Sequence, residues 1–140
     1  VGSTRWCMVD LNTFSVLPTS AFFKGDTREY NDFRALDFNS WRLPPLKEGE
    51  KKYGKIVSYS DYDHYNHVNN TKYADMCMDA FSVDEMKERS LKSVQITYVK
   101  QCKYGEKLEF FRRDDGEFSY IEGRVDGEAR VRMKMSFFKN

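Results

Sequence analysis

The sequence predicts an α+β domain in which one long antiparallel sheet wraps around a central helix. Residues 129–137 alternate strictly between apolar and polar side chains, which is typical of a strand with one buried and one wet face. Two Asp-Gly pairs, at 115–116 and 126–127, indicate hairpin turns. The segment over about 69–81 carries apolar residues on more than one helical face, so other structure should enclose it.

The remaining elements of this domain follow from caps and local composition. Asn69 or Asn70 can cap the central helix, and Asp84 can cap a short second helix. The first strand of the antiparallel run should carry Val94 and Ile96 on one face, together with Tyr98. The expected elements are a strand at 54–59, the central helix, a short helix at 85–89, and strands at 91–100, 107–113, 118–124 and 129–137.

The beginning of the chain has a different character. A strand is expected within 4–10, a turn at Asp10, and a returning strand over 14–17. Because two strands alone are rarely stable, this pair should complete another sheet. Residues 18–50 hold all three prolines and several charges, as a linker does. Its scattered aromatic residues are expected to anchor it, and they include Phe33, Phe38 and Trp41.

Composition excludes several classes of function. The 23 basic and 22 acidic residues give a net charge of +1, which leaves no electrostatic footprint for nucleic acid. Apolar runs are too short to span a membrane, and the first residues resemble neither a signal nor a transit peptide. Cys7, Cys77 and Cys102 form no Cys-x-x-Cys pair, which favours free thiols in a reducing compartment such as the cytoplasm. His64 and His67, without a nearby cysteine, are a poor zinc set, so neither a metal nor a cofactor is expected. The chain does not begin with Met, so we expect it to be part of a longer protein.

Residues 60–73 concentrate the polar chemistry of the chain, with two carboxylates, both histidines and three asparagines where a strand gives way to a helix. Asp63 and His67 are four residues apart, so their side chains can converge. A carboxylate beside an imidazole fixes its tautomer and raises its basicity, as a general base requires. The N–H groups at the start of the helix can stabilise a polarised carbonyl. This combination indicates hydrolysis of an activated acyl group by water. Alternatively, Asp63, Asn66 and Asn70 only cap and turn the chain.

Other catalytic arrangements have weaker support. The sequence contains no Gly-x-Ser-x-Gly motif. Cys102 and His67 can be imagined as a nucleophile and its base, but a buried, inert thiol is the usual state of a free cysteine. Cys77 lies in an apolar helical context and is expected in the core.

At this point the sequence resembles a known family. Residues 60–73, Ser-Asp-Tyr-Asp-His-Tyr-Asn-His-Val-Asn-Asn-Thr-Lys-Tyr, are similar to the signature of acyl-acyl-carrier-protein thioesterases, roughly Ser-Asp-x-Asp-x-Asn-x-His-Val-Asn-Asn-x-x-Tyr. In that family the signature opens the second of two hot-dog domains. Residues 96–105 resemble the strand that carries the family's Glu-Cys pair, and residues 5–13 resemble the last strands of the first hot dog. The resemblance implies that residues 1–50 are the end of a first hot-dog domain and a linker, and that residues 51–140 form the hot-dog thioesterase domain.

The resemblance also implies a catalytic set. Asp63 and His67 occupy the family's Asp and His places, Tyr65 stands where the family has Asn, and Gln101 stands where it has Glu. Glutamine cannot take up a proton, so Gln101 can only orient water or substrate through hydrogen bonds. Asn66 can replace the missing amide if the turn shifts by one residue. The family's neighbouring cysteine matches Cys102, and His64 is either a second imidazole at the site or an exposed turn residue.

The activity implied by the resemblance is hydrolysis of the thioester in acyl-acyl-carrier protein, which releases free fatty acid during fatty acid biosynthesis. The implied partner is an acyl-carrier protein with a pantetheine-linked acyl chain. Because hot-dog units generally associate in pairs, the domain is expected to pair with another hot-dog unit. The departures at Tyr65 and Gln101 leave two alternatives open. One is a module that binds acyl-pantetheine without cleaving it, and the other is an acyl-coenzyme A hydrolase.

Overall fold

The structure is a computed structural model that describes residues 2, 4, 8–10, 12–13, 15–18, 20 and 42–138. The chain divides into two compact units, Val1–Trp41 and Arg42–Asn140. In the first unit, β1 (Met8–Val9) pairs antiparallel with β2 (Val16–Leu17). The turn between them is held by Asp10, whose Oδ1 accepts the N–H groups of Asn12 and Thr13 at 2.9 and 2.8 Å. The expected anchors Phe33, Phe38 and Trp41, and also Cys7, lie outside the described residues.

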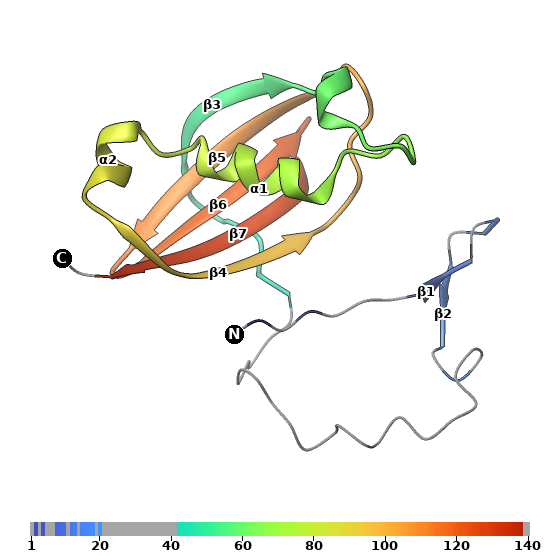
Figure 1. Cartoon of the computed structure of the whole chain (residues 1–140), viewed down its shortest axis with the longest axis horizontal. Helices are drawn as coiled ribbons and strands as arrows, with labels where there is room; N and C mark the ends of the chain where they lie inside the picture. Colours follow the sequence, from blue (N-terminus) through green and yellow to red (C-terminus); the bar gives the residue numbers. More distant parts are fainter. Residues whose placement is uncertain are drawn as a thin grey trace. The chain divides into compact units, whose positions relative to one another are not determined.

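The second unit is built on one five-stranded antiparallel sheet (Figure 1). Its strands are β3 (Glu50–Ile56), β4 (Ser90–Tyr98), β5 (Lys107–Asp115), β6 (Phe118–Val125) and β7 (Glu128–Phe138). The spatial order is β3-β5-β6-β7-β4, so β5, β6 and β7 form the predicted hairpin run, whereas β4 lies at the far edge beside β7. The strand patterns predict the members of the sheet but not this crossover, because pairing order depends on contacts between residues far apart in sequence.

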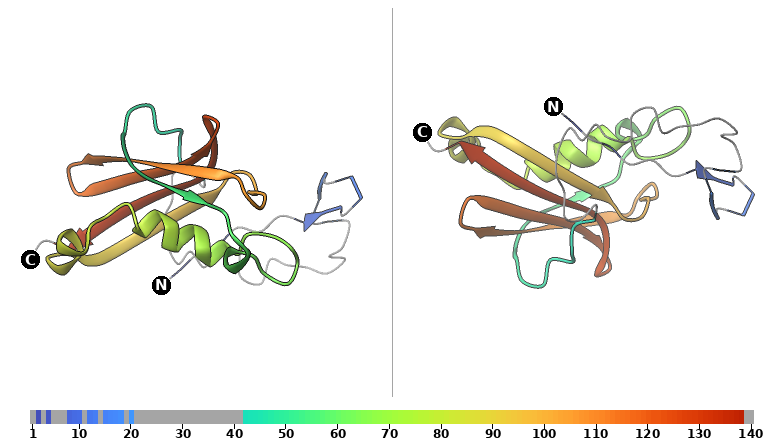
Figure 2. Two further views of the ribbon diagram at one scale, coloured as in Figure 1. Left: turned by 90° about the horizontal axis from the view of Figure 1, so that it is seen from above. Right: turned by 90° about the horizontal axis from the view of Figure 1, so that it is seen from below.

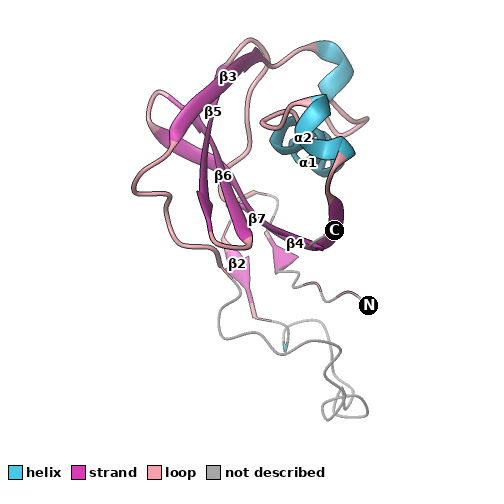
Figure 3. Ribbon diagram, turned by 90° about the vertical axis from the view of Figure 1, so that its left-hand side faces the viewer, coloured by secondary structure: helices cyan, strands magenta, loops and turns pink. Residues whose placement is uncertain are grey.

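One helix occupies the concave side of the sheet (Figure 2), and Figure 3 shows that the helices lie on one side of it. The 3₁₀ turn η3 (Tyr59–Asp61) leads to α1 (Asn70–Met78), and α2 (Val83–Lys87) follows. The prediction of a helix apolar on several faces is confirmed, since Tyr73, Met76 and Cys77 are all at most 2% exposed. They pack with residues of β5, β6 and β7 in one core, which includes Leu108, Phe110, Ile121, Val131, Met133 and Met135.

Three predicted boundaries were wrong. The central helix ends at Met78 rather than near Phe81, because the chain turns to bury Phe81, and the Ala80 carbonyl accepts Arg112 Nη1 at 2.8 Å. The second helix is capped by Ser82 rather than Asp84, because Ser82 and Glu85 satisfy each other's backbone N–H groups in a capping box.

The third boundary is that of the first strand, which covers 50–56 rather than 54–59. It stops where Ser58 caps the 3₁₀ turn and the Asp61 carboxylate accepts the Ser58 N–H at 2.8 Å. A polar side chain that satisfies the backbone locally competes with a sheet ladder and ends the strand.

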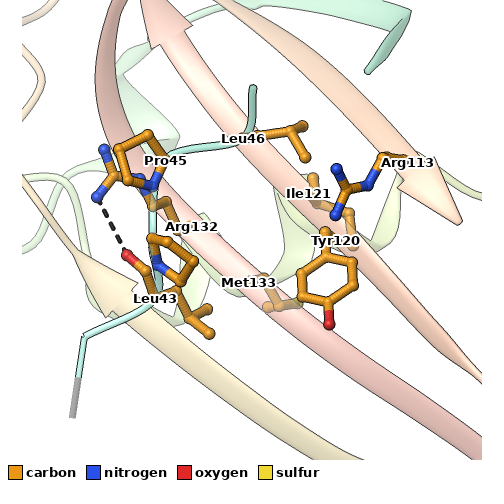
Figure 4. Close-up of a pocket in the computed structure, with 9 residues that line it drawn as sticks. Leu43, Pro45, Leu46, Arg113, Tyr120, Ile121, Arg132 and Met133 are labelled. Carbon is orange, nitrogen blue, oxygen red and sulfur yellow. Dashed lines mark hydrogen bonds between the residues drawn. The ribbon is translucent and has the colours of Figure 1, made fainter. Parts of the chain in front are cut away.

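The face of the sheet opposite α1 is crossed by residues 43–46, which we call the strap (Figure 4). Leu43 and Leu46 of the strap are buried. Its backbone bonds to a charge cluster on β6 and β7, in which Glu122 accepts from Arg124 and Arg132 at 2.6 Å each. Four hydrogen bonds then tie the strap to the sheet: Leu43 N–H to Thr97 Oγ1, Leu46 N–H to Glu122 Oε2, Arg124 Nη2 to the Leu46 carbonyl, and Arg132 Nη1 to the Leu43 carbonyl.

A small pocket of about 140 Å³ lies between the strap and the sheet. Figure 4 shows the strap leucines and Pro45 on one side, with Arg113 and Tyr120 on the other. None of the residues 60–73 lines it. The pocket therefore belongs to the packing of the strap and not to the polar cluster that the sequence singles out.

Candidate active site

The loop over 63–67 is a tight, internally bonded turn. The Asp63 N–H donates to the His67 carbonyl at 2.8 Å. Asp63 Oδ1 in turn accepts the N–H groups of Tyr65 and His67 at 2.9 and 3.2 Å. Asn66 has φ 59°, a left-handed conformation that asparagine tolerates better than most residues. The loop is thus held in one shape by its own backbone and by one carboxylate.

Asp63 and His67 lie together at the base of the loop through bonds that involve the His67 backbone, whereas the sequence predicts convergence of their side chains. Among the described residues, no hydrogen bond or ion pair joins the Asp63 carboxylate to either imidazole. The capping role that the sequence offered as an alternative is present in the structure. It engages Oδ1 only, so the carboxylate keeps a second oxygen, and an Asp63–His67 catalytic pair stays a prediction.

The loop residues 64–67 are exposed, whereas Asp63 is half-buried. Tyr65 is 70% exposed, and its ring stacks in a tilted arrangement on His64 with centroids 3.8 Å apart. His67 is also exposed. An exposed imidazole at a helix start is accessible to a substrate carried on a flexible arm. The roles of Tyr65 and of Asn66 stay predictions.

The start of α1 is anchored and capped beside this loop. Val68 is 1% exposed and forms a β-bridge with Tyr62. Asn69 caps the helix, as predicted, by accepting the Thr71 N–H at 2.9 Å. The N–H of Asn70 precedes the first intrahelical bond, and no residue in the described part of the chain accepts it. The positive end of the helix dipole therefore offers a donor three residues after His67.

Gln101 reaches the same place from the segment after β4. Its Nε2 donates to the Val68 carbonyl at 3.2 Å, and its Oε1 accepts the Tyr73 hydroxyl at 2.8 Å. The Tyr73 oxygen also accepts the Cys102 N–H at 2.8 Å. The structure thus brings Gln101 to the helix start that carries His67, across 34 positions of sequence.

Two buried polar groups at this site were not anticipated. Tyr73 counts as an apolar helix residue in the sequence pattern, yet its hydroxyl joins Gln101 to Cys102; the signal is that a buried tyrosine hydroxyl needs a partner. Asp61 is buried and accepts from Ser58 and from Lys55 Nζ, which lies 3.1 Å away. Burial alone would raise the pKa of Asp61, but these hydrogen bonds outweigh it and hold the pKa below its usual range.

The cysteines have the environment of inert thiols. Cys102 is 2% exposed and Cys77 is fully buried, and neither forms a disulfide. Burial raises the pKa of the Cys102 thiol and that of Cys77, the latter to about 12. Because the thiolate is the nucleophile, this environment favours the inert alternative over a Cys–His pair. Among the described residues, no three His, Cys, Asp or Glu side chains gather as metal ligands would.

Comparison with protein families assigns the domain. The profile of the acyl-ACP thioesterase C-terminal domain matches residues 46–137. This match covers more than half of the chain, so the chain belongs to the acyl-ACP thioesterase family. The search of curated proteins found no match.

Solved structures of thioesterases share the fold. An acyl-ACP thioesterase from Bacteroides thetaiotaomicron aligns with TM-score 0.76 and 20% identity, over 93% of this chain and 53% of its own. The 12:0-ACP thioesterase from Umbellularia californica aligns with TM-score 0.68 and 16% identity, over 94% and 53%. A thioesterase from Thermus thermophilus, solved with coenzyme A and Zn, gives TM-score 0.58 and 16% identity, over 68% and 82%. These likenesses establish the fold as a hot dog of the α+β class, and the chain spans about half the length of the two acyl-ACP enzymes.

Proposed function

We propose that this domain supplies the catalytic histidine of a thioesterase that releases free fatty acid from acyl-acyl-carrier protein. The observation that supports the proposal most directly is the 3.2 Å hydrogen bond from Gln101 Nε2 to the carbonyl of Val68, the residue after His67. It joins the position at which the family's Glu stands to the residue that follows the family's His. The family assignment of residues 46–137 gives the reaction class.

The proposed reaction is attack by water on the thioester carbonyl carbon. His67 takes the proton of the water as the new C–O bond forms, with Asp63 orienting the imidazole. The Asn70 N–H stabilises the negative charge that develops on the carbonyl oxygen. Tyr65 and Gln101 orient water and substrate by hydrogen bonds. The C–S bond then breaks, and the proton passes to the departing pantetheine thiolate, which leaves a fatty acid and a thiol.

Two alternative functions each have a specific observation in their favour. Gln101 is neutral, and the backbone bonds of Asp63 occupy one carboxylate oxygen, which favours a module that binds acyl-pantetheine without cleaving it. The fold shared with a thioesterase solved with coenzyme A favours hydrolysis of acyl-coenzyme A. Rates on acyl-carrier protein and coenzyme A bearing the same acyl chain separate these alternatives.

The decisive experiment is His67→Ala, assayed on medium- and long-chain acyl thioesters. Loss of the general base should lower turnover by about 10² to 10⁴. The urea midpoint should stay at the wild-type value, because the exposed imidazole makes no hydrogen bond within the described chain. Lys72→Ala, which removes a half-exposed side chain from the start of α1, is the control and should retain turnover. Unchanged turnover in His67→Ala would remove the proposal.

The proposal also covers the domain organisation of the protein, its pairing with another hot-dog unit and its location in the cell. Residues 1–50 would end a first hot-dog domain and form its linker, and residues 51–140 would form the second. β4 supports pairing with another hot-dog unit, because it is an edge strand whose Leu91, Val94 and Tyr98 are 44–46% exposed. A cytoplasmic location would give access to acyl-carrier protein. None of the helices in the described parts of the chain is long and apolar enough to cross a membrane.

A further inference from the structure

Three hydrogen bonds at the candidate site form one directed chain. They run from the Cys102 N–H to the Tyr73 oxygen at 2.8 Å, from the Tyr73 hydroxyl to Gln101 Oε1 at 2.8 Å, and from Gln101 Nε2 to the Val68 carbonyl at 3.2 Å. The two ends have fixed polarity, because a backbone N–H can only donate and a backbone carbonyl can only accept. The chemistry of the ends therefore decides the direction of everything between them.

This polarity determines the orientation of the Gln101 amide. The Val68 carbonyl can only accept, so the amide nitrogen of Gln101 must face it. The amide oxygen then faces Tyr73, whose hydroxyl donates its single hydrogen there while its oxygen accepts the Cys102 N–H. The flipped amide would set Oε1 against the Val68 carbonyl, placing two acceptors together and losing a hydrogen bond. The assignment thus follows from the network and not from the shape of the amide, whose two ends look alike.

The Tyr73 hydroxyl, in the middle of these three hydrogen bonds, is held rigidly. Tyr73 is 2% exposed and lies on α1, with its ring centroid 6.0 Å from that of Tyr98. Burial raises the pKa of the Tyr73 hydroxyl, so it keeps its proton and remains a donor to Gln101. Gln101, in contrast, is exposed. The second hydrogen on Gln101 Nε2 has no acceptor among the described residues. The first hydrogen already holds this amide at the Val68 carbonyl, just before α1.

We infer that Tyr73 is a positioning residue that holds the Gln101 amide nitrogen toward the helix start, so that Gln101 donates a hydrogen bond to the carbonyl oxygen of a bound acyl thioester. This inference rests on the proposed function for the identity of the ligand. It assigns Gln101 a role opposite to that of a glutamate at the same place, since a carboxylate accepts hydrogen bonds whereas this amide donates one. Gln101 and the Asn70 N–H would then act on the same oxygen.

The orientation can be tested by NMR without turnover, because Gln95 and Gln101 are the only glutamines in the chain. Labelling glutamine with ¹⁵N at Nε2 gives two pairs of side-chain signals. Tyr73→Phe should shift the Gln101 pair toward the values of a free amide and leave the Gln95 pair in place. Tyr53→Phe is the matched control, because it removes another hydroxyl that donates to α1, at the Met76 carbonyl, and should move neither pair.

The donor role is tested with an acyl-pantetheine in which an amide replaces the thioester, so that the probe binds but is not cleaved. Binding should shift the Gln101 pair in the wild type. On a cleavable acyl thioester, Tyr73→Phe should lower kcat roughly 10- to 100-fold with little change in KM, as expected when a donor acts mainly in the transition state. Gln101→Glu should also lower turnover, because its second oxygen would face the Val68 carbonyl.

The outcomes separate this inference from the proposed function. If the Gln101 signals do not respond to Tyr73→Phe, or do not respond to the probe, the inference is overturned. Higher turnover in Gln101→Glu also overturns it, since an acceptor would then be better than a donor. If both NMR responses occur while the wild type cleaves no thioester, the hydrolase proposal fails and the positioning role of Tyr73 stands for a binding module.

Discussion

Replacing Glu122 with alanine should destabilise the domain by detaching the strap, residues 43–46, from the sheet. Glu122 is 3% exposed and is the only carboxylate in contact with Arg124, Arg132 and the Leu46 N–H among the described residues. Its removal leaves a buried N–H without an acceptor, which costs about 1–3 kcal/mol. The two guanidinium groups lose their counter-charge but keep strap carbonyls as acceptors, and their side chains are 24% and 18% exposed.

The total loss of unfolding free energy in Glu122→Ala should therefore lie near the lower end of the range for breaking a buried ion pair, about 3–5 kcal/mol. For a unit of this size, 3 kcal/mol corresponds to a fall in Tm of roughly 12–24 °C. Urea denaturation and a thermal scan measure both quantities. Glu122→Gln keeps an acceptor for the Leu46 N–H, so it should cost less, about 1–2 kcal/mol. The free energy of unfolding of Glu122→Ala would contradict this account if it lay within about 0.5 kcal/mol of the wild-type value, which is the range of ordinary surface substitutions.

The same contacts predict a pH dependence. Burial alone would raise the pKa of Glu122, but hydrogen bonds from Arg132, Arg124 and the Leu46 N–H outweigh it and hold the pKa below its ordinary value of 4.5. A depressed carboxyl pKa stabilises the folded state above the ordinary value, and this stability is lost as the pH falls through the folded-state pKa. The difference in stability between wild type and Glu122→Ala should be full at neutral pH and shrink in acid.

Two further predictions concern packing and assembly. Gly123→Ala should lower the free energy of unfolding by about 1–3 kcal/mol in urea denaturation, because the new Cβ would lie 2.8 Å from Phe110 Cε1 in a closely packed core. Gly54→Ala is the control and should change stability little, because its Cβ would meet the flexible end of a lysine side chain at 3.3 Å. Equal effects of the two substitutions would contradict the packing argument. If β4 is a pairing edge, sedimentation should give a mass above 16.6 kDa for the wild type and the monomer mass for Val94→Lys, while Val83→Lys on α2 behaves as wild type. A monomeric wild type at all concentrations would exclude self-pairing through β4.

The elements of this domain are largely determined by local sequence. Strict alternation over 129–137 and the Asp-Gly turns predict the hairpins of β5, β6 and β7, because side-chain direction and turn conformation are local properties. The apolar helix is predicted for the same reason. The end of this helix is not predicted. It lies at Met78 because Phe81 is buried and Arg112 donates to the Ala80 carbonyl, and both of these are long-range effects.

The candidate site likewise combines features determined by local sequence with contacts that depend on the folded chain. By itself the sequence indicated the turn around Asp63 and a cap at Asn69 or Asn70, and it singled out His67, all within one short segment whose chemistry is local. Only the tertiary structure decided that Gln101 meets Val68, that Tyr73 directs the Gln101 amide, and that Glu122 secures the strap. Each of these contacts joins residues 28 to 76 positions apart. Such partners are chosen by the requirement that every buried polar group find a complement in the folded chain, and no local pattern records that requirement.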